Sequence, residues 1–331
     1  MAQIYENQKA FHYKYPENHP IVSLIYLLLF VMIGAFVFSL LGIGIGFAMH
    51  GVDILKDLPA LMGGNSDEGI LFLKIFQLVS SIGVFVVPSL LLRTFERKRS
   101  FYYDFSGPKE RQLIWLTIGI MLLAGPVIEI SGYLNQQMKL PESLANMEAW
   151  MEAKELEMKL VTEKMLHGVS FLDLLLNLIV VAVVPAIGEE LLFRGSLQPI
   201  LTRWFKNPHV AIWVAAIVFS AIHVQFYGFI PRLLMGAAFG YLFYWSKSIW
   251  LPILAHFLNN AAAVILFFVG QRQGKTYEEL SEADLSYWPV AIVCAGILVY
   301  LFIRFKKLSE DEDTGETGGL TDNKEKNELE S

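Results

Sequence analysis

The sequence contains little cysteine and little charge, and it opens without a recognisable leader. Cys294 is the only cysteine among 331 residues, which excludes an intramolecular disulfide and a cysteine-rich metal site. Only 18% of the residues are charged and 54% are hydrophobic, whereas soluble domains usually carry about a quarter charged residues. The first twenty residues, through Pro20, have no apolar core or small-residue cleavage site, so we do not expect a cleaved signal peptide. The first apolar run is therefore expected to act as an uncleaved signal anchor.

Long apolar runs occupy much of the chain. Most are long enough to cross a hydrocarbon layer, for which an α-helix needs about 20 residues. None alternates as a barrel strand does, and a lone segment in lipid satisfies its own backbone only as a helix. The sequence thus predicts an all-α polytopic membrane protein in a lipid bilayer, with about eight transmembrane helices. They are expected at residues 21–49, 70–93, 112–134, 171–197, 210–227, 230–246, 249–269 and 288–305.

The distribution of lysine and arginine predicts the orientation. Cytoplasmic loops are enriched in these residues, and here they gather in segments 93–111 and 189–209 and directly after the last span. The segments 50–69, 135–170 and 270–288 are acid-rich and are expected outside. With eight spans, both termini lie in the cytoplasm, and the expected location is a bacterial cytoplasmic membrane.

Six parts are expected along the chain. The long loop contains many good helix formers, which favours an amphipathic helix at the outer surface, either a lid or a plain connector. The last part carries nine acidic and four basic residues, a net charge of −5, which is typical of a disordered, solvated tail. The parts are a cytoplasmic segment 1–20, three helices in 21–134, an extracytoplasmic loop 135–170, a four-helix core 171–269, a loop and last helix 270–305, and the tail 306–331.

Glycines within the apolar runs have a packing explanation. Gly42, Gly44 and Gly46 superficially resemble a nucleotide-binding loop, but they lie inside a span with no preceding strand. Gly236 and Gly240 share the small-xxx-small spacing of Gly42 and Gly46, which lets membrane helices approach closely. We expect helix packing at these positions, and no nucleic-acid partner for the chain.

The first polar fragment inside these runs contains Glu189, Glu190 and Arg194. Charged side chains at mid-bilayer cost roughly 2.5–3.5 kcal/mol each on insertion scales. Glu190 and Arg194 are four residues apart, so they share a helix face and can pair, while Glu189 points about 100° away. Pro185 precedes them and kinks the helix, which frees carbonyl groups. The fragment indicates either one paired carboxylate beside a free base, or an ion-pair cluster at the end of the span.

Two further fragments lie in later runs. His223 follows Phe219 by four residues on an apolar helix, and His256 precedes Asn260 by the same spacing. A single buried histidine is more often structural than catalytic, and a His–Asn pair can be an ordinary interhelical clamp. Together, the three fragments supply the residue types of water activation and oxyanion stabilisation, which indicates hydrolysis within a membrane.

The three fragments match the patterns EExxxR, FxxxH and HxxxN in identity, order and spacing, within about residues 171–269. In this the chain closely resembles the CAAX protease and bacteriocin-processing (CPBP, or Abi) family, which includes the type II prenyl-protein proteases. The resemblance implies an intramembrane endopeptidase with a site reached from the cytoplasm. It implies that Glu189 is the base that activates water and that His223 helps to hold that water. It further implies that His256 and Asn260 stabilise the oxyanion, with Glu190 and Arg194 ordering the site.

The expected substrate is a membrane-associated protein or peptide, prenylated in the eukaryotic branch of the family, and in a bacterium a peptide or bacteriocin to be matured. A metal is left open. Glu189, His223 and His256 resemble the ligands of a catalytic Zn²⁺ or another divalent ion, yet the sequence has no HExxH. Two other functions are considered: a non-catalytic immunity or scaffold protein of the same family, and a transporter with a proton relay. The sequence shows no convincing inverted repeat, which speaks against the transporter.

Overall fold

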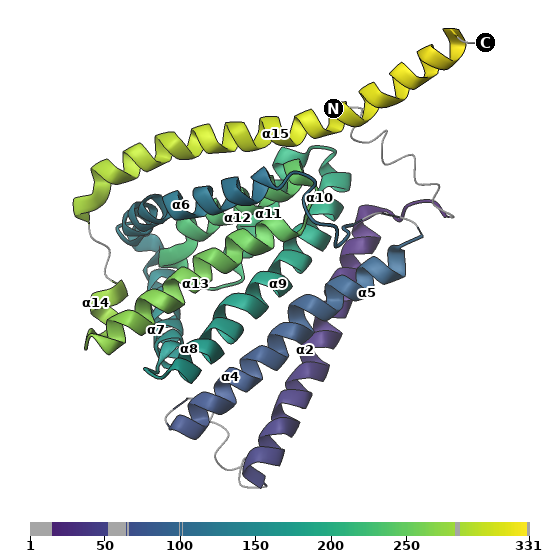
Figure 1. The fold of residues 1–331 in the computed structure, drawn as a ribbon. Coiled ribbons are helices and arrows are strands. Elements are labelled where there is room, and N and C mark those ends of the chain that lie inside the picture. Colours follow the sequence, from purple (N-terminus) through teal and green to yellow (C-terminus); the bar gives the residue numbers. More distant parts are fainter. Residues whose placement is uncertain are drawn as a thin grey trace.

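The computed structural model describes residues 15–51, 64, 66–98, 100, 102–281 and 285–329, and the regular elements in this part are all helical (Figure 1). Residues 1–14 of the expected cytoplasmic segment and most of the acid-rich segment 50–69 lie outside the described residues. The elements are α2 (Pro20–His50), α4 (Asp67–Ser81), η2 (Ile82–Val86), α5 (Val87–Glu96), α6 (Gln112–Gln136), η3 (Glu142–Leu144), α7 (Ala145–Leu166), α8 (Phe171–Asn177), η4 (Leu178–Val183), α9 (Val184–Glu190), η5 (Leu191–Leu197), α10 (Gln198–Phe205), α11 (Pro208–Ala221), η6 (Phe226–Gly228), α12 (Phe229–Ser246), α13 (Trp250–Arg272), α14 (Tyr277–Ser281), η7 (Leu285–Tyr287) and α15 (Trp288–Leu329).

The prediction of an all-α polytopic membrane protein is confirmed. Within the described residues, seven helical stretches are long and apolar enough to cross a membrane, and α11 is a shorter apolar helix. The seven stretches are Pro20–Met49, Asp67–Glu96, Gln112–Gln136, Phe171–Phe205, Phe226–Ser246, Trp250–Arg272 and Trp288–Glu310.

Three predicted boundaries differ from the structure. The fourth span continues to Phe205 instead of ending at 197, since Pro199 directly follows the π turn η5 and does not end the helix. The fifth ends at Ala221 instead of 227, because Val224 has a φ of 53°, which a right-handed helix does not allow. α15 runs on to Leu329 through most of the tail 306–331, a segment that contains no proline.

The helices form a bundle in which α8 to α13 lie between two outer groups of helices, as Figure 1 shows. α2 packs along α4, η2 and α5 at one edge, and α15 runs along α6 at the other. Close approach depends on glycine. A Cβ on Gly34 would lie 1.9 Å from the carbonyl oxygen of Gly83, and one on Gly240 would lie 2.8 Å from Ile212. Gly236 likewise approaches Ala216 of α11, so the predicted packing role of Gly236 and Gly240 is confirmed.

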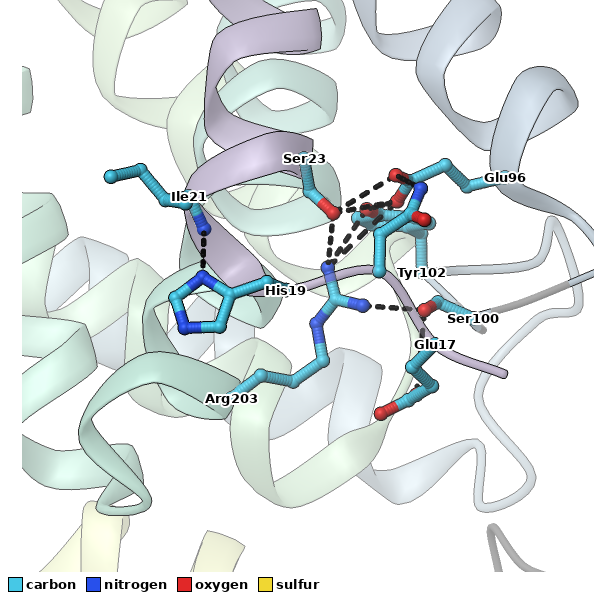
Figure 2. Close-up of polar contacts among 9 residues, drawn as sticks. Glu17, His19, Ile21, Ser23, Glu96, Ser100, Tyr102 and Arg203 are labelled. Carbon is cyan, nitrogen blue, oxygen red and sulfur yellow. Dashed lines mark hydrogen bonds and ion pairs between the residues drawn. The ribbon is translucent and has the colours of Figure 1, made fainter. Parts of the chain in front are cut away.

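A buried polar cluster joins the ends of α2, α5 and α10 (Figure 2). The fully buried Glu96 accepts hydrogen bonds from Asn18 Nδ2 at 2.7 Å and Ser23 Oγ at 2.9 Å, and from the hydroxyl of Tyr102. Arg203, on α10, donates to Ser23 Oγ at 3.1 Å and to Tyr102 Oη at 2.9 Å. Burial raises the pKa of Tyr102, so its hydroxyl keeps the proton it donates to Glu96. The cluster fixes the first two spans against the helix that carries Glu189 and Glu190.

Candidate active site

Glu189 and Glu190 lie in the middle of a continuous helix from Phe171 to Phe205. The 16 residues from Glu189 to Phe205 span roughly 24 Å at about 1.5 Å per residue. The prediction that Glu189 lies near the inner end of its span is therefore wrong. The π-helical turns η4 and η5 flank the two carboxylates on either side. Such turns change the direction of successive side chains and recur at functional sites.

Glu190 is the centre of a buried charged group. Its Oε1 accepts a hydrogen bond from Arg194 Nη1 at 2.7 Å and another from His256 Nδ1 at 2.8 Å. Glu190 and Arg194 are 0% and 1% exposed, so neither charge is solvated and each depends on the other. Arg194 Nη2 also donates to the carbonyl of Gly236 at 2.9 Å, which ties the pair to α12. The predicted pairing of Glu190 with Arg194 is formed.

Aromatic rings surround this charged group. The guanidinium carbon of Arg194 lies 4.7 Å from the ring centre of Phe219 and 5.4 Å from that of Phe239. Phe239 also stacks on the imidazole of His256, with ring centres 5.3 Å apart. The rings exclude water and hold the guanidinium by cation–π contacts. These contacts restrict the orientation of the Arg194 guanidinium, and the stacking on Phe239 fixes the plane of the His256 ring.

Glu189 is placed differently from its neighbour. It is 9% exposed, and its Oε2 lies 4.0 Å from His256 Nε2. Among the described residues no hydrogen-bond partner reaches this oxygen. His256 therefore lies between the two carboxylates, with Nδ1 bound to Glu190 and Nε2 directed at Glu189. One carboxylate is neutralised by strong contacts, and the other is buried with a lone pair available for chemistry.

His223 lies two residues beyond the end of α11, so the prediction that it sits on the helix is wrong. The turn still keeps it near Phe219, because His223 Nδ1 donates to the Phe219 carbonyl at 2.7 Å. The Phe219 ring lies 5.1 Å from the His223 ring and 6.0 Å from the His256 ring, measured between centres. Phe219 thus connects the two histidines.

Asn260 makes a hydrogen bond that was not part of its predicted role in oxyanion stabilisation. Its Nδ2 donates to the carbonyl of Val181 at 3.0 Å, and Asn259 donates to its Oδ1 at 3.1 Å. Val181 lies in the π turn η4 close to Pro185, which has no N–H to donate to this part of the helix. Asn260 therefore satisfies a carbonyl beside the predicted kink. Its amide retains a second N–H, which is the one compatible with a role toward substrate.

A second buried network holds the π turn that carries Arg194. Ser89 Oγ donates to the carbonyl of Leu191 at 2.7 Å and lies 2.8 Å from Ser196 Oγ and 3.0 Å from Tyr103 Oη. The Tyr103 ring packs directly on Gly195, where a Cβ would approach it to 2.8 Å. Sequence reasoning missed these residues, since single serines and a loop tyrosine carry no spacing signal.

The proposed metal ligands do not form a three-ligand site in this arrangement. His256 Nδ1 is bound to Glu190 and His223 Nδ1 to a carbonyl, which leaves Nε2 of each ring unused by these hydrogen bonds, as in metal-bound histidines. Across the described ranges, however, no group of three or more His, Cys, Asp or Glu side chains lies close enough together to hold a metal ion. The metal site at Glu189, His223 and His256 therefore stays a prediction.

Comparison with known proteins agrees with the motifs. Residues 171–262 match a family model described as type II CAAX prenyl endopeptidase Rce1-like, which confirms the predicted resemblance over this segment. Two proteins of Bacillus subtilis (strain 168) are similar. "Putative membrane peptidase YdiL" is 31% identical over 91 residues, 28% of this chain and 37% of its own length. "Uncharacterized protein YpbD" is 27% identical over 107 residues, 31% of this chain and 47% of its own length.

The chain thus aligns with less than half the length of these two relatives. No solved structure matches it. The matched segment contains all six predicted site residues, and it includes α8 to α12 and the first half of α13. This integral membrane protein therefore carries a segment similar to a family of membrane endopeptidases, and that segment coincides with the buried charged group.

Proposed function

We propose that the chain is an intramembrane endopeptidase in which Glu189 activates water to hydrolyse a peptide bond of a membrane-associated protein or peptide. The observation that carries this proposal is the asymmetry of the two adjacent glutamates. Oε1 of Glu190 is bound by Arg194 and His256 and this side chain is fully buried, whereas Glu189 is 9% exposed and its unpartnered Oε2 lies 4.0 Å from His256 Nε2. A base needs a lone pair that water can reach. Oε2 of Glu190 also lacks a partner among the described residues, but it is fully buried beside a neutralising guanidinium, so Glu189 is the better base.

In the proposed reaction, Glu189 removes a proton from water and the resulting hydroxide attacks the carbonyl carbon of the scissile bond. The carbonyl oxygen becomes an oxyanion, toward which a protonated Nε2 of His256 and the second N–H of Asn260 are the candidate donors. Glu189 then gives its proton to the departing nitrogen as the C–N bond breaks. The products are a carboxylic acid and an amine, which become a carboxylate and an ammonium group by exchanging one proton, so one water is consumed and the base is regenerated.

The remaining residues hold these groups in place. Glu190 binds Nδ1 of His256, and this contact holds the opposite ring nitrogen, Nε2, toward Glu189. Arg194 balances the charge of Glu190 and anchors it to α12 through Gly236. His223 is proposed to help hold the water. A base and a donor positioned in this way contribute about 10²–10⁴-fold each in comparable enzymes.

The experiment that tests this function is a comparison of peptide termini in membranes from cells expressing the wild type or Glu189→Gln at equal abundance. Glu142→Gln is the matched control, because Glu142 is exposed in η3, away from the site. We expect termini that the wild type and the control produce and that Glu189→Gln lacks. Identical termini in all three would contradict proteolysis and favour a non-catalytic immunity or scaffold protein. Proton-coupled uptake in sealed vesicles, lost in His223→Ala, would favour a transporter.

The metal prediction is tested separately. Elemental analysis of the purified wild type and of a His223→Ala, His256→Ala double variant compares metal content per chain. A stoichiometric divalent ion in the wild type that is lost in the variant would support the predicted ligands. Equal content in both proteins, with activity preserved in chelator, would refute them.

A further inference from the structure

The turn between α11 and α12 carries His223 in a strained backbone. Val224 follows His223 directly and has a φ of 53°, in the left-handed region. A β-branched residue rarely adopts this conformation, and it persists only where the surroundings enforce it. The position of His223 therefore depends on whatever holds the turn from 222 to 228.

Arg232, in the first turn of α12, holds this turn at two points. Its Nη1 donates to the side-chain Oε1 of Gln225 at 2.9 Å, and its Nη2 donates to the Gln225 backbone carbonyl at 2.6 Å. The guanidinium also covers Gly228, where an added Cβ would lie 2.7 Å from Nη2. A planar fork with two donors suits this pair of acceptors on one residue. Arg232 thus closes the turn onto the start of α12.

The charge of Arg232 acts electrostatically on Glu189 and His223, and on Glu155 of α7. Glu155 in turn accepts a hydrogen bond from the backbone N–H of Tyr227, at 3.3 Å, within the same turn. Arg232 of α12 and Glu155 of α7 thus both hold residues of the turn from 222 to 228.

We propose that Arg232 is a positioning residue, whose two-point contact with Gln225 fixes the strained turn and thereby the place of His223 in the site. This inference rests on the proposed function for its catalytic consequence, since His223 matters to turnover only if the chain is a protease. The turn itself, however, exists whether or not the protein cuts a substrate. Its test can therefore be separated from the test of proteolysis.

The test combines hydrogen exchange with kinetics on the purified full chain in lipid nanodiscs. The variants are Arg232→Ala, Arg232→Lys and Gln225→Ala, and the control is Arg272→Ala, at the exposed end of α13. We expect the amides of residues 222–228 to exchange about 100-fold faster in Arg232→Ala, since two hydrogen bonds are lost and each contributes about a factor of ten. Arg232→Lys should give about a tenfold increase, because an ammonium keeps the charge but cannot span both acceptors. Gln225→Ala, which loses only the side-chain acceptor, should also give about a tenfold increase, and Arg272→Ala none.

The kinetic arm uses a membrane protein whose cleavage depends on Glu189 in the comparison of termini. Arg232→Ala is expected to lower kcat by about 10- to 100-fold with KM changed by less than about threefold, as for a misplaced catalytic group. Unchanged exchange in Arg232→Ala, or full recovery of exchange and kcat in Arg232→Lys, would overturn the two-point contact. If Glu189→Gln cuts as well as the wild type, the proposed function fails, while the exchange result still decides the structural role of Arg232.

Discussion

The asymmetry between Glu189 and Glu190 leads to opposite expectations for two substitutions of equal size. Glu190→Gln removes the negative charge between Arg194 and His256, and leaves a guanidinium that is 1% exposed without its counter-charge. Breaking a buried pair from one side costs about 3–5 kcal/mol. For a large chain, at about 2 °C per kcal/mol, this corresponds to a fall in Tm of roughly 6–10 °C.

Glu189→Gln removes no protein hydrogen bond from Oε2, because that oxygen has no partner among the described residues. It also relieves the cost of burying a charge, so we expect stability to be unchanged or slightly higher. Activity should instead fall by about 10²-fold or more, since an amide cannot accept the proton of water. The two glutamates would thus separate stability from catalysis.

Thermal unfolding of both purified variants in the same detergent measures the first quantity, and cleavage of a substrate found in the comparison of termini measures the second. Glu142→Gln serves again as the control for loss of one surface carboxylate. An equal loss of Tm in Glu189→Gln and Glu190→Gln would refute the assignment of separate roles. So would a Glu190→Gln protein as stable as the wild type, because the ion pair would then contribute nothing to the fold.

Two further expectations follow from the helix that carries these residues. Asn260→Ala should destabilise the wild type by about 1 kcal/mol but a Pro185→Ala background by less, because alanine returns a backbone donor to the helix beside the carbonyl of Val181 and lets η4 revert to regular α-helix. Additive effects in a double-mutant cycle of unfolding would contradict this. Gly195→Ala should cost about 1–3 kcal/mol in unfolding, since its Cβ would lie 2.8 Å from the Tyr103 ring, whereas Gly296→Ala, with open space around it, should be neutral or mildly stabilising.

Sequence periodicity was sufficient for the pairing of Glu190 with Arg194. Their i, i+4 spacing predicts one shared face, and the structure forms that pair at 2.7 Å although Arg194 lies in the π turn η5. Helix geometry likewise points Glu189 away from its neighbour and toward another element, which proves to be α13. The expected spans follow from apolar runs whose lengths are set by the bilayer.

The depth of each site residue along its span could not be predicted from periodicity. Measured from its helix start at Trp250, His256 is roughly 9 Å along α13, and Glu189 is roughly 24 Å from the end of α10. The 2.8 Å contact between His256 and Glu190 nevertheless brings the two helices together at this point. The helix ends therefore do not lie in one plane, and counting residues from each end gives no common depth. Only packing between helices fixes it.

The groups proposed to act on substrate lie where the α-helix is interrupted, or where a side chain supplies a hydrogen bond to an irregular turn. Glu189 lies between two π turns, and His223 follows a helix that ends early. Asn260 donates a hydrogen bond to a carbonyl of η4 near Pro185. In hydrocarbon, irregular backbone is tolerated only where protein or a polar cavity supplies the missing hydrogen bonds. The same interruptions that lower helix regularity thus supply the polar groups and directions that a hydrolytic site requires. This explains why span boundaries were predicted least well around the site, since there the requirements of function override local helix preference.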